Sequence, residues 1–112
     1  MEMKSLIGKY RVLSVNGRPA PAGVTVEFKP GENSGTIQMH AKVANFMNGQ
    51  LKLGNRKLSG TLVSTMMLGS DDLMNIENAL SQGFMDGMAY TVHDGGKLTL
   101  KSNTHTIKLV PA

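Results

Sequence analysis

The chain has 112 residues, which is the length of one domain and enough for one modest hydrophobic core. Its 40% hydrophobic and 18% charged residues are typical of a globular protein, and the net charge of +4 is spread along the sequence. Cysteine is absent, which excludes disulfides, thiol nucleophiles and cysteine-based zinc sites. With no apolar run of about 20 residues and no signal-peptide pattern, we expect an intracellular, cytoplasmic protein without a transmembrane segment.

Alternating apolar and polar residues predict three strands in the first part of the chain. The first covers Lys9–Val15, where the alternation slips at Leu13 and indicates a β-bulge. The second covers residues 24–29. The third covers residues 37–43 and has the clearest alternation in the sequence.

Two turn signals follow this third strand. Asn48-Gly49 is typical of a tight hairpin turn, so we expect the chain to reverse there before a strand at 51–53. Gly54-Asn55 predicts the next turn, which leads into a short strand over residues 58–63.

One segment has helical rather than alternating periodicity. Apolar residues recur at helical spacing from Leu73 to Phe84 and form a single apolar stripe. Ser70 suits the N-cap position, and acidic residues follow it in the first turn, where the helix dipole favours them. We therefore predict a helix from Ser70 to about Phe84, with Gly83 and Gly87 marking its end. Short strands are predicted again at 90–93, 97–101 and 107–109.

These elements predict an α+β fold that is mainly antiparallel β. Seven or eight short strands each have one apolar face, so the sheet buries a single side. A sheet of this length in so small a chain should curl on itself. We expect a small curled sheet or partly open β-barrel with one α-helix packed on it, in one domain spanning residues 1–112.

Five short motifs follow one another in a characteristic order. They are an opening strand with an Asn-Gly turn, an Asn followed by a Gly, a Ser-Thr-x-Met segment, a helix carrying Glu and Leu, and a closing strand. In this sequence they are Gly8–Val12 with Val15-Asn16-Gly17, Asn45 and Gly49, Ser64–Met67, Glu77 and Leu80, and Gly96–Leu100. Together they resemble the META domain family, which includes the HslJ-like bacterial proteins. The resemblance implies a small barrel-like domain with no established catalytic activity.

Within that family the chain looks most like the short META proteins of trypanosomatid parasites. The segments His40–Val43 and Gly83–Gly87 carry this impression. Many bacterial members have cysteines where this chain has Ala44 and a residue near Leu68, so the disulfide of the bacterial envelope proteins is missing. The resemblance also implies an association with stress tolerance, virulence, secretion or motility.

The sequence contains no recognisable catalytic, cofactor-binding or metal-ligating pattern. His40, His93 and His105 lie far apart, and we interpret them as solvated surface residues rather than ligands. Aromatic residues make up only 4%, too few for the stacking platforms of a nucleic-acid site. We therefore expect a non-enzymatic protein without a cofactor that does not bind nucleic acid.

Methionine is unusually frequent, with 9 residues. Its unbranched side chain suits irregular cores and also surfaces that accept varied partners. If the barrel does not close fully, residues around the helix would line its seam as a groove for a partner or ligand. The candidates are Met66, Met67, Met74, Phe84, Met85 and Met88.

Three interpretations of these residues remain open. In the first, a monomeric, non-enzymatic module contacts a protein or lipid partner through the groove. In the second, a small barrel carries one hydrophobic, acyl-type ligand. In the third, the methionines only fill the core and pack the helix.

Overall fold

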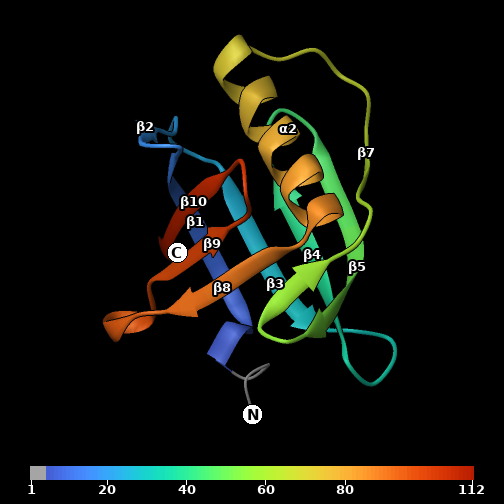
Figure 1. Ribbon diagram of the computed structural model, residues 1–112. Coiled ribbons are helices and arrows are strands. Elements are labelled where there is room, and N and C mark those ends of the chain that lie inside the picture. Colours follow the sequence, from blue (N-terminus) through green and yellow to red (C-terminus); the bar gives the residue numbers. More distant parts are fainter. Residues whose placement is uncertain (1–4) are drawn as a thin grey trace.

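A computed structural model describes residues 5–112 of the chain (Figure 1). The strands are β1 (Gly8–Val15), β2 (Arg18–Pro19), β3 (Thr25–Pro30), β4 (Thr36–Lys42), β5 (Phe46–Gly54), β6 (Lys57–Ser59), β7 (Val63–Ser64), β8 (Met88–Val92), β9 (Leu98–Lys101) and β10 (Thr106–Pro111). The helix α2 (Asp71–Asp86) lies between β7 and β8 in the sequence, and a short 3-10 turn, η1 (Asp94–Gly96), joins β8 to β9.

Antiparallel strands close into a barrel. Neighbours follow the order β1, β3, β4, β5, β6, β8, β9, β10, and the pairing of β10 with β1 completes the circuit. The short strands β2 and β7 lie outside this circuit and pair with β1 and β5. The predicted α+β fold with a curled antiparallel sheet is therefore confirmed, and the barrel is closed rather than partly open.

The irregularity predicted in the first strand is confirmed. The register between β1 and β10 shifts between Val12 and Ser14, which places the bulge at Leu13. Val12 is buried on one side of this shift, whereas Leu13 is exposed. The bulge thus explains why an apolar residue interrupts the alternation without joining the core.

The turn predicted at Asn48-Gly49 is wrong. Both residues lie inside β5 and pair with β4, where Asn48 faces His40 and Gly49 faces Met39. The chain reverses earlier, at residues 43–45, between the end of β4 and the start of β5. The Asn48-Gly49 dipeptide, which is typical of hairpin turns, therefore lies within a strand in this protein.

Gly49 is required by close packing instead of a turn. A Cβ atom at this position would lie 2.8 Å from the carbonyl oxygen of Thr61 and 2.7 Å from Cδ2 of Leu62. Glycine inside a strand often marks such an approach of another backbone. It lets the chain after β6 cross β5 in direct contact. The turn predicted at Gly54-Asn55 lies one residue further on, at Asn55 and Arg56, which have positive φ of 51° and 60°.

The helix α2 lies across one end of the barrel, at the top of Figure 1. Its predicted start is confirmed because the Ser70 side chain accepts a hydrogen bond from the Leu73 amide at 3.3 Å. Of the two glycines predicted to mark its end, Gly87 does so with a φ of 94°. Gly83 instead lies buried inside the helix, where a Cβ would come within 2.6 Å of Sδ of Met88. The apolar stripe predicted from helical spacing points into the barrel through buried Leu80 and Phe84.

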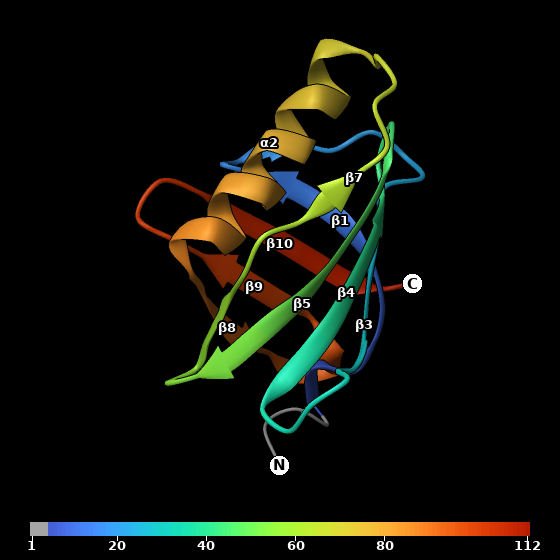
Figure 2. The ribbon, with the colours of Figure 1, turned by 90° about the vertical axis from the view of Figure 1, so that its right-hand side faces the viewer.

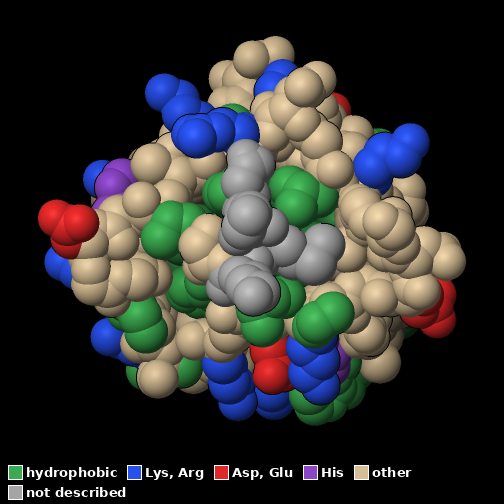
Figure 3. Space-filling model, turned by 90° about the horizontal axis from the view of Figure 1, so that it is seen from below, with side chains coloured by type: hydrophobic (Ala, Val, Ile, Leu, Met, Phe, Trp, Pro, Cys, Tyr) green, Lys and Arg blue, Asp and Glu red, His purple; other side chains and the backbone are tan. Residues whose placement is uncertain are grey.

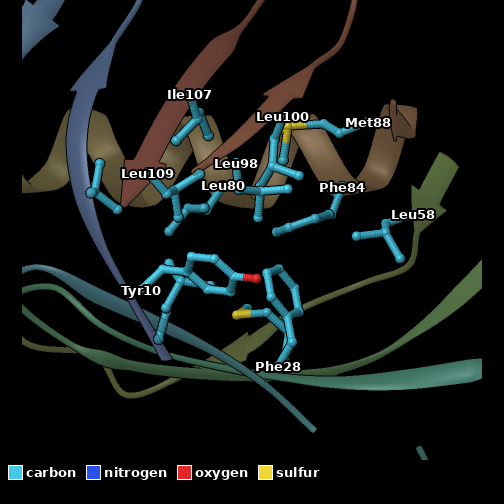
Figure 4. Close-up of a cluster of buried hydrophobic side chains, with 14 of the residues drawn as sticks. Tyr10, Phe28, Leu58, Leu80, Phe84, Met88, Leu98, Leu100, Ile107 and Leu109 are labelled. Carbon is cyan, nitrogen blue, oxygen red and sulfur yellow. The ribbon is translucent and has the colours of Figure 1, made fainter. Parts of the chain in front are cut away.

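Side chains fill the space between the helix and the sheet. Figure 4 shows Phe84 and Leu80 of α2 facing Tyr10 of β1 and Phe28 of β3. The ring centroids of Tyr10 and Phe28 lie 6.0 Å apart, and those of Phe28 and Phe84 lie 6.5 Å apart, both edge to face. Seen from below, apolar side chains gather toward the middle of the face and charged ones lie mostly toward its edge (Figure 3).

Candidate functional site

The chain between β6 and α2 runs along the outside of the barrel. This stretch, residues 60–70, is called the 60–70 segment below; Figure 2 shows it passing β5 at β7 and then curving up to the start of α2. Residues 61–70 contain no charged side chain. Several of its apolar side chains are nonetheless exposed: Val63 by 73%, Met66 by 97%, Met67 by 53% and Leu68 by 96%. Contiguous exposed apolar side chains on a small protein are typical of interaction surfaces.

Backbone pairing attaches the first half of the segment to the barrel. Val63 and Ser64 of β7 pair with Asn48 and Met47 of β5. The Thr65 amide then donates to the carbonyl oxygen of Phe46 at 3.1 Å. This half of the segment is therefore held as an added strand.

The Asn45 side chain attaches the second half of the segment. Its Oδ1 accepts hydrogen bonds from the Met67 amide at 2.7 Å and from the Thr65 hydroxyl at 2.8 Å. Its Nδ2 donates to the carbonyl oxygen of Met67 at 2.9 Å. One side chain thus replaces the backbone partners that a neighbouring strand would supply to Met67, although Asn45 itself is only 2% exposed.

Glu77 of α2 completes this buried network. The Asn45 amide donates to Glu77 Oε2 at 2.7 Å, and Nδ2 of Asn45 lies 3.0 Å and 3.1 Å from the two carboxyl oxygens. Burying a carboxyl group is costly unless hydrogen bonds satisfy it, and here they do. The network links the β4–β5 turn, the helix and the 60–70 segment. It holds the segment in place, and we call it the anchor below.

Sequence reasoning named Asn45, Ser64–Met67 and Glu77 from a resemblance, without a role. The structure brings these motifs together in the anchor through Thr65 and Met67. Asn45 and Glu77 are 32 residues apart, and no local spacing links them. Their contact could not be derived from periodicity.

The structure divides the six residues expected to form a groove. Phe84 and Met88 are 0% exposed and belong to the core, and Met74 is half-buried. Met66 and Met67 are exposed before the start of α2, whereas Met85 is exposed near its C-terminal end. The barrel has no open seam for all six to line. Only the exposed members are accessible to a partner.

Sequence reasoning missed three of the exposed apolar residues, Val63, Leu68 and Phe46. The ring of Phe46 stacks on that of His40 at 5.9 Å, and Lys42 Nζ lies 5.6 Å from its centre. The uncharged run through residues 61–70 was a signal that could have drawn attention to Val63 and Leu68.

The three histidines lie on different elements. His40 hydrogen-bonds to Asn48 at 2.6 Å, His93 to Thr99 at 2.8 Å and His105 to Thr104 at 2.9 Å. Across residues 5–112, no three His, Asp or Glu side chains gather in the arrangement of a metal site. Within the same range, no helix has the length and apolar character needed to cross a bilayer.

This combination defines a class of protein: a small antiparallel barrel closed by one helix, with a pinned segment on its outer surface. The META domain model matches residues 4–112, so the chain belongs to the META domain family.

One solved structure has the same fold. It is an NMR structure of a protein from Burkholderia xenovorans, with 20% sequence identity and a TM-score of 0.69. The match covers 98% of this chain and 86% of the other. At this identity the similarity concerns the fold alone. No curated protein matched the sequence.

Proposed function

We propose that this chain is a non-enzymatic interaction module that binds a protein or lipid partner through the 60–70 segment. The observation that carries the proposal is the exposure of Val63, Met66 and Leu68 on a segment whose backbone is fixed. Exposing these side chains to water is unfavourable, by about 25 cal/mol for each Å² that a partner would cover. A fixed segment also loses little conformational entropy when it binds.

The barrel interior gives less support to a carrier of one hydrophobic ligand. The positions that a ligand would occupy are taken by fully buried side chains such as Phe28, Phe84 and Met39. Binding inside would require these side chains to leave a close-packed core. The outer surface needs no such rearrangement, so the interaction module is the better supported of the two functions.

Further properties are proposed on the basis of the sequence resemblance. They are the HslJ-like and trypanosomatid character of the chain, its intracellular location, its monomeric state and a role in stress tolerance, virulence or secretion. Of these properties, the exposed surface supports only the role, because a protein that acts in such a process needs a surface that binds a partner.

The test uses substitutions that place a charge on the segment without touching the core. Met66→Asp and Leu68→Asp should keep the fold, because both side chains are almost fully exposed. Val92→Asp serves as a control, since Val92 is an exposed apolar residue on β8. Phe84→Asp is unsuitable because it would place a charge in the core.

Two measurements separate the partner classes. Protein partners are captured from the native organism with each variant, and lipid binding is measured by sedimentation with zwitterionic and anionic phospholipid vesicles. We expect Met66→Asp and Leu68→Asp to lose binding in one of the two assays while Val92→Asp keeps it. Folded segment variants that bind as the wild type does in both assays would refute the proposal.

A further inference from the structure

A cavity of about 450 Å³ that is open to solvent on one side lies between the β1–β2 turn, the first half of α2 and the β9–β10 turn. Its volume falls within the range of about 300 to 1,000 Å³ that is typical of small-molecule sites. None of the six residues expected to form a groove lines it, and it is separate from the 60–70 segment. It is therefore a second candidate site, independent of the proposed interaction surface.

The floor of this cavity is apolar. Ile76 and Ala79 of α2 are buried there, and Val15 and Pro21 are half-buried beside them. Ile76 and Ala79 lie on the same face of the helix because they are three residues apart. Such a floor suits an aliphatic group of a ligand.

The wall formed by the strands offers hydrogen-bond donors. Oδ1 of Asn16 accepts from the Thr106 amide at 2.7 Å, so its NH₂ group remains for a ligand. Nδ1 of His105 is engaged with Thr104 at 2.9 Å, which leaves Nε2 as a donor when Nδ1 accepts from the Thr104 hydroxyl. Arg18 adds a guanidinium group to the same rim. A ligand that faces this wall should carry acceptor oxygens.

The helix contributes two amide side chains, Asn75 and Asn78. Asparagine is a poor helix former because its side chain competes for backbone hydrogen bonds. Both residues are exposed, and neither has a side-chain hydrogen bond among those found within residues 5–112. The two amide groups therefore face the solvent at the rim, where each can donate to and accept from an amide of a ligand.

The charge on the rim is already partly paired. Arg18 Nη1 lies 3.7 Å from Asp72 Oδ1, and the side chains are 72% and 59% exposed. An ion pair this open and this long contributes little to stability, so Arg18 can exchange partners at small cost. A carboxylate in the cavity would compete with Asp72 for the guanidinium, which prefers carboxylates as partners.

We propose that this cavity binds an aliphatic carboxylate that also carries an amide, as in an N-acyl amino acid with an apolar side chain. Arg18 binds the carboxylate together with the donors of Asn16 and His105. Asn75 and Asn78 bind the amide, and the apolar floor takes the aliphatic side chain. The C-terminal residue of a peptide has the same chemistry, and the experiment distinguishes the two sources.

The first measurement is an NMR titration of the full chain with N-acetyl-leucine, followed by backbone amide shifts. We expect saturable shifts at residues 15–21, 72–79 and 105, and binding about tenfold weaker for N-acetyl-leucinamide, which lacks the charge. An acetylated tripeptide ending in free leucine forms the second arm. Tighter binding of the tripeptide identifies a peptide end, and equal binding identifies the free N-acyl amino acid. The proposal would be overturned by amide shifts that do not saturate or that occur at other residues. Equal affinities for N-acetyl-leucine and N-acetyl-leucinamide would overturn it as well.

Three variants test the role of the charges. Arg18→Gln should weaken binding of N-acetyl-leucine about tenfold. Asp72→Asn should strengthen it, because it removes the competing carboxylate and keeps the shape. Arg11→Gln on β1 is the matched control outside the cavity lining and should leave binding unchanged. If Arg18→Gln binds like the wild type, or Asp72→Asn binds more weakly in a folded chain, the assignment fails.

Discussion

The barrel interior and the 60–70 segment have opposite polarity. In the barrel, apolar side chains such as Phe28 and Leu80 are buried, and the charged ones face water. Where the segment is attached, the buried side chains that hold it are polar, Asn45 and Glu77, while Leu68 of the segment lies in water. Apolar burial therefore stabilises the barrel, whereas hydrogen bonds hold the segment in place. Leu62 of the segment packs against the core, whereas exposed Val63, Met66 and Leu68 add little to it and are available to a partner.

The largest expected effect comes from one substitution made in both regions. Leu80→Ala removes a fully buried side chain and should lower the free energy of unfolding by about 3 kcal/mol. Leu68→Ala removes a side chain that is 96% exposed and should change it by less than about 0.5 kcal/mol. Denaturant unfolding of both variants measures the difference. Equal losses would contradict the division into core and surface.

The anchor should give the next largest effect. Asn45→Ala removes the acceptor of the Met67 amide and leaves the buried carboxyl of Glu77 with fewer donors. We expect a loss of about 2 kcal/mol in the free energy of unfolding, because buried groups remain unsatisfied. Asn48→Ala, which removes one exposed contact with His40, is the matched control and should cost about 0.5 kcal/mol. The anchor hypothesis fails if the two variants unfold alike.

The crossing at Gly49 tests how closely the chain after β6 lies against β5. Gly49→Ala forces a Cβ atom against the Thr61 carbonyl and Leu62. The Thr61 carbonyl is part of the backbone and cannot move aside as a flexible side chain can. We therefore expect the free energy of unfolding to fall by about 1.5 kcal/mol. Gly54→Ala in the same strand, with open space around its Cβ, should cost less. Thermal unfolding compares the two, and an equal change for both would mean that the crossing is looser than described.

The smallest effect is a pH dependence inside the barrel. Burial raises the pKa of Tyr10 from its ordinary value of 10.0, and its hydroxyl donates to the Leu6 carbonyl at 2.9 Å. The folded state therefore keeps this proton at a pH where the unfolded chain has released it. The contribution is constant below about pH 10 and is lost as the pH rises further. Unfolding from pH 8 to 11 should show a shallower alkaline decline for Tyr10→Phe; an identical decline would exclude Tyr10 as its source.

Much of the barrel could be predicted from the sequence because its cause is local. Strand alternation, the bulge at Leu13 and the caps Ser70 and Gly87 all follow from neighbouring residues. The failure at Asn48-Gly49 has a non-local cause. A glycine needed for contact with Thr61 looks the same in sequence as a glycine needed for a turn.

The site was less predictable than the fold. Helical spacing placed Phe84 correctly on the apolar stripe, but the same methionine-rich pattern could not separate core Met88 from exposed Met66. The separation depends on closure of the barrel and on the hydrogen bonds between Asn45 and Glu77, which join distant parts of the chain. Neither the closure of the barrel nor these hydrogen bonds produce a periodic pattern in the sequence.

The central claim is that polar contacts fix the 60–70 segment while Val63, Met66 and Leu68 stay in water. Hydrogen exchange of single backbone amides tests it most directly. The Met67 amide, bonded to Asn45 Oδ1 at 2.7 Å, should exchange far more slowly than the Leu68 amide, although both side chains are exposed. Exchange of Met67 as fast as that of Leu68 would mean that the segment is not anchored and would contradict the account.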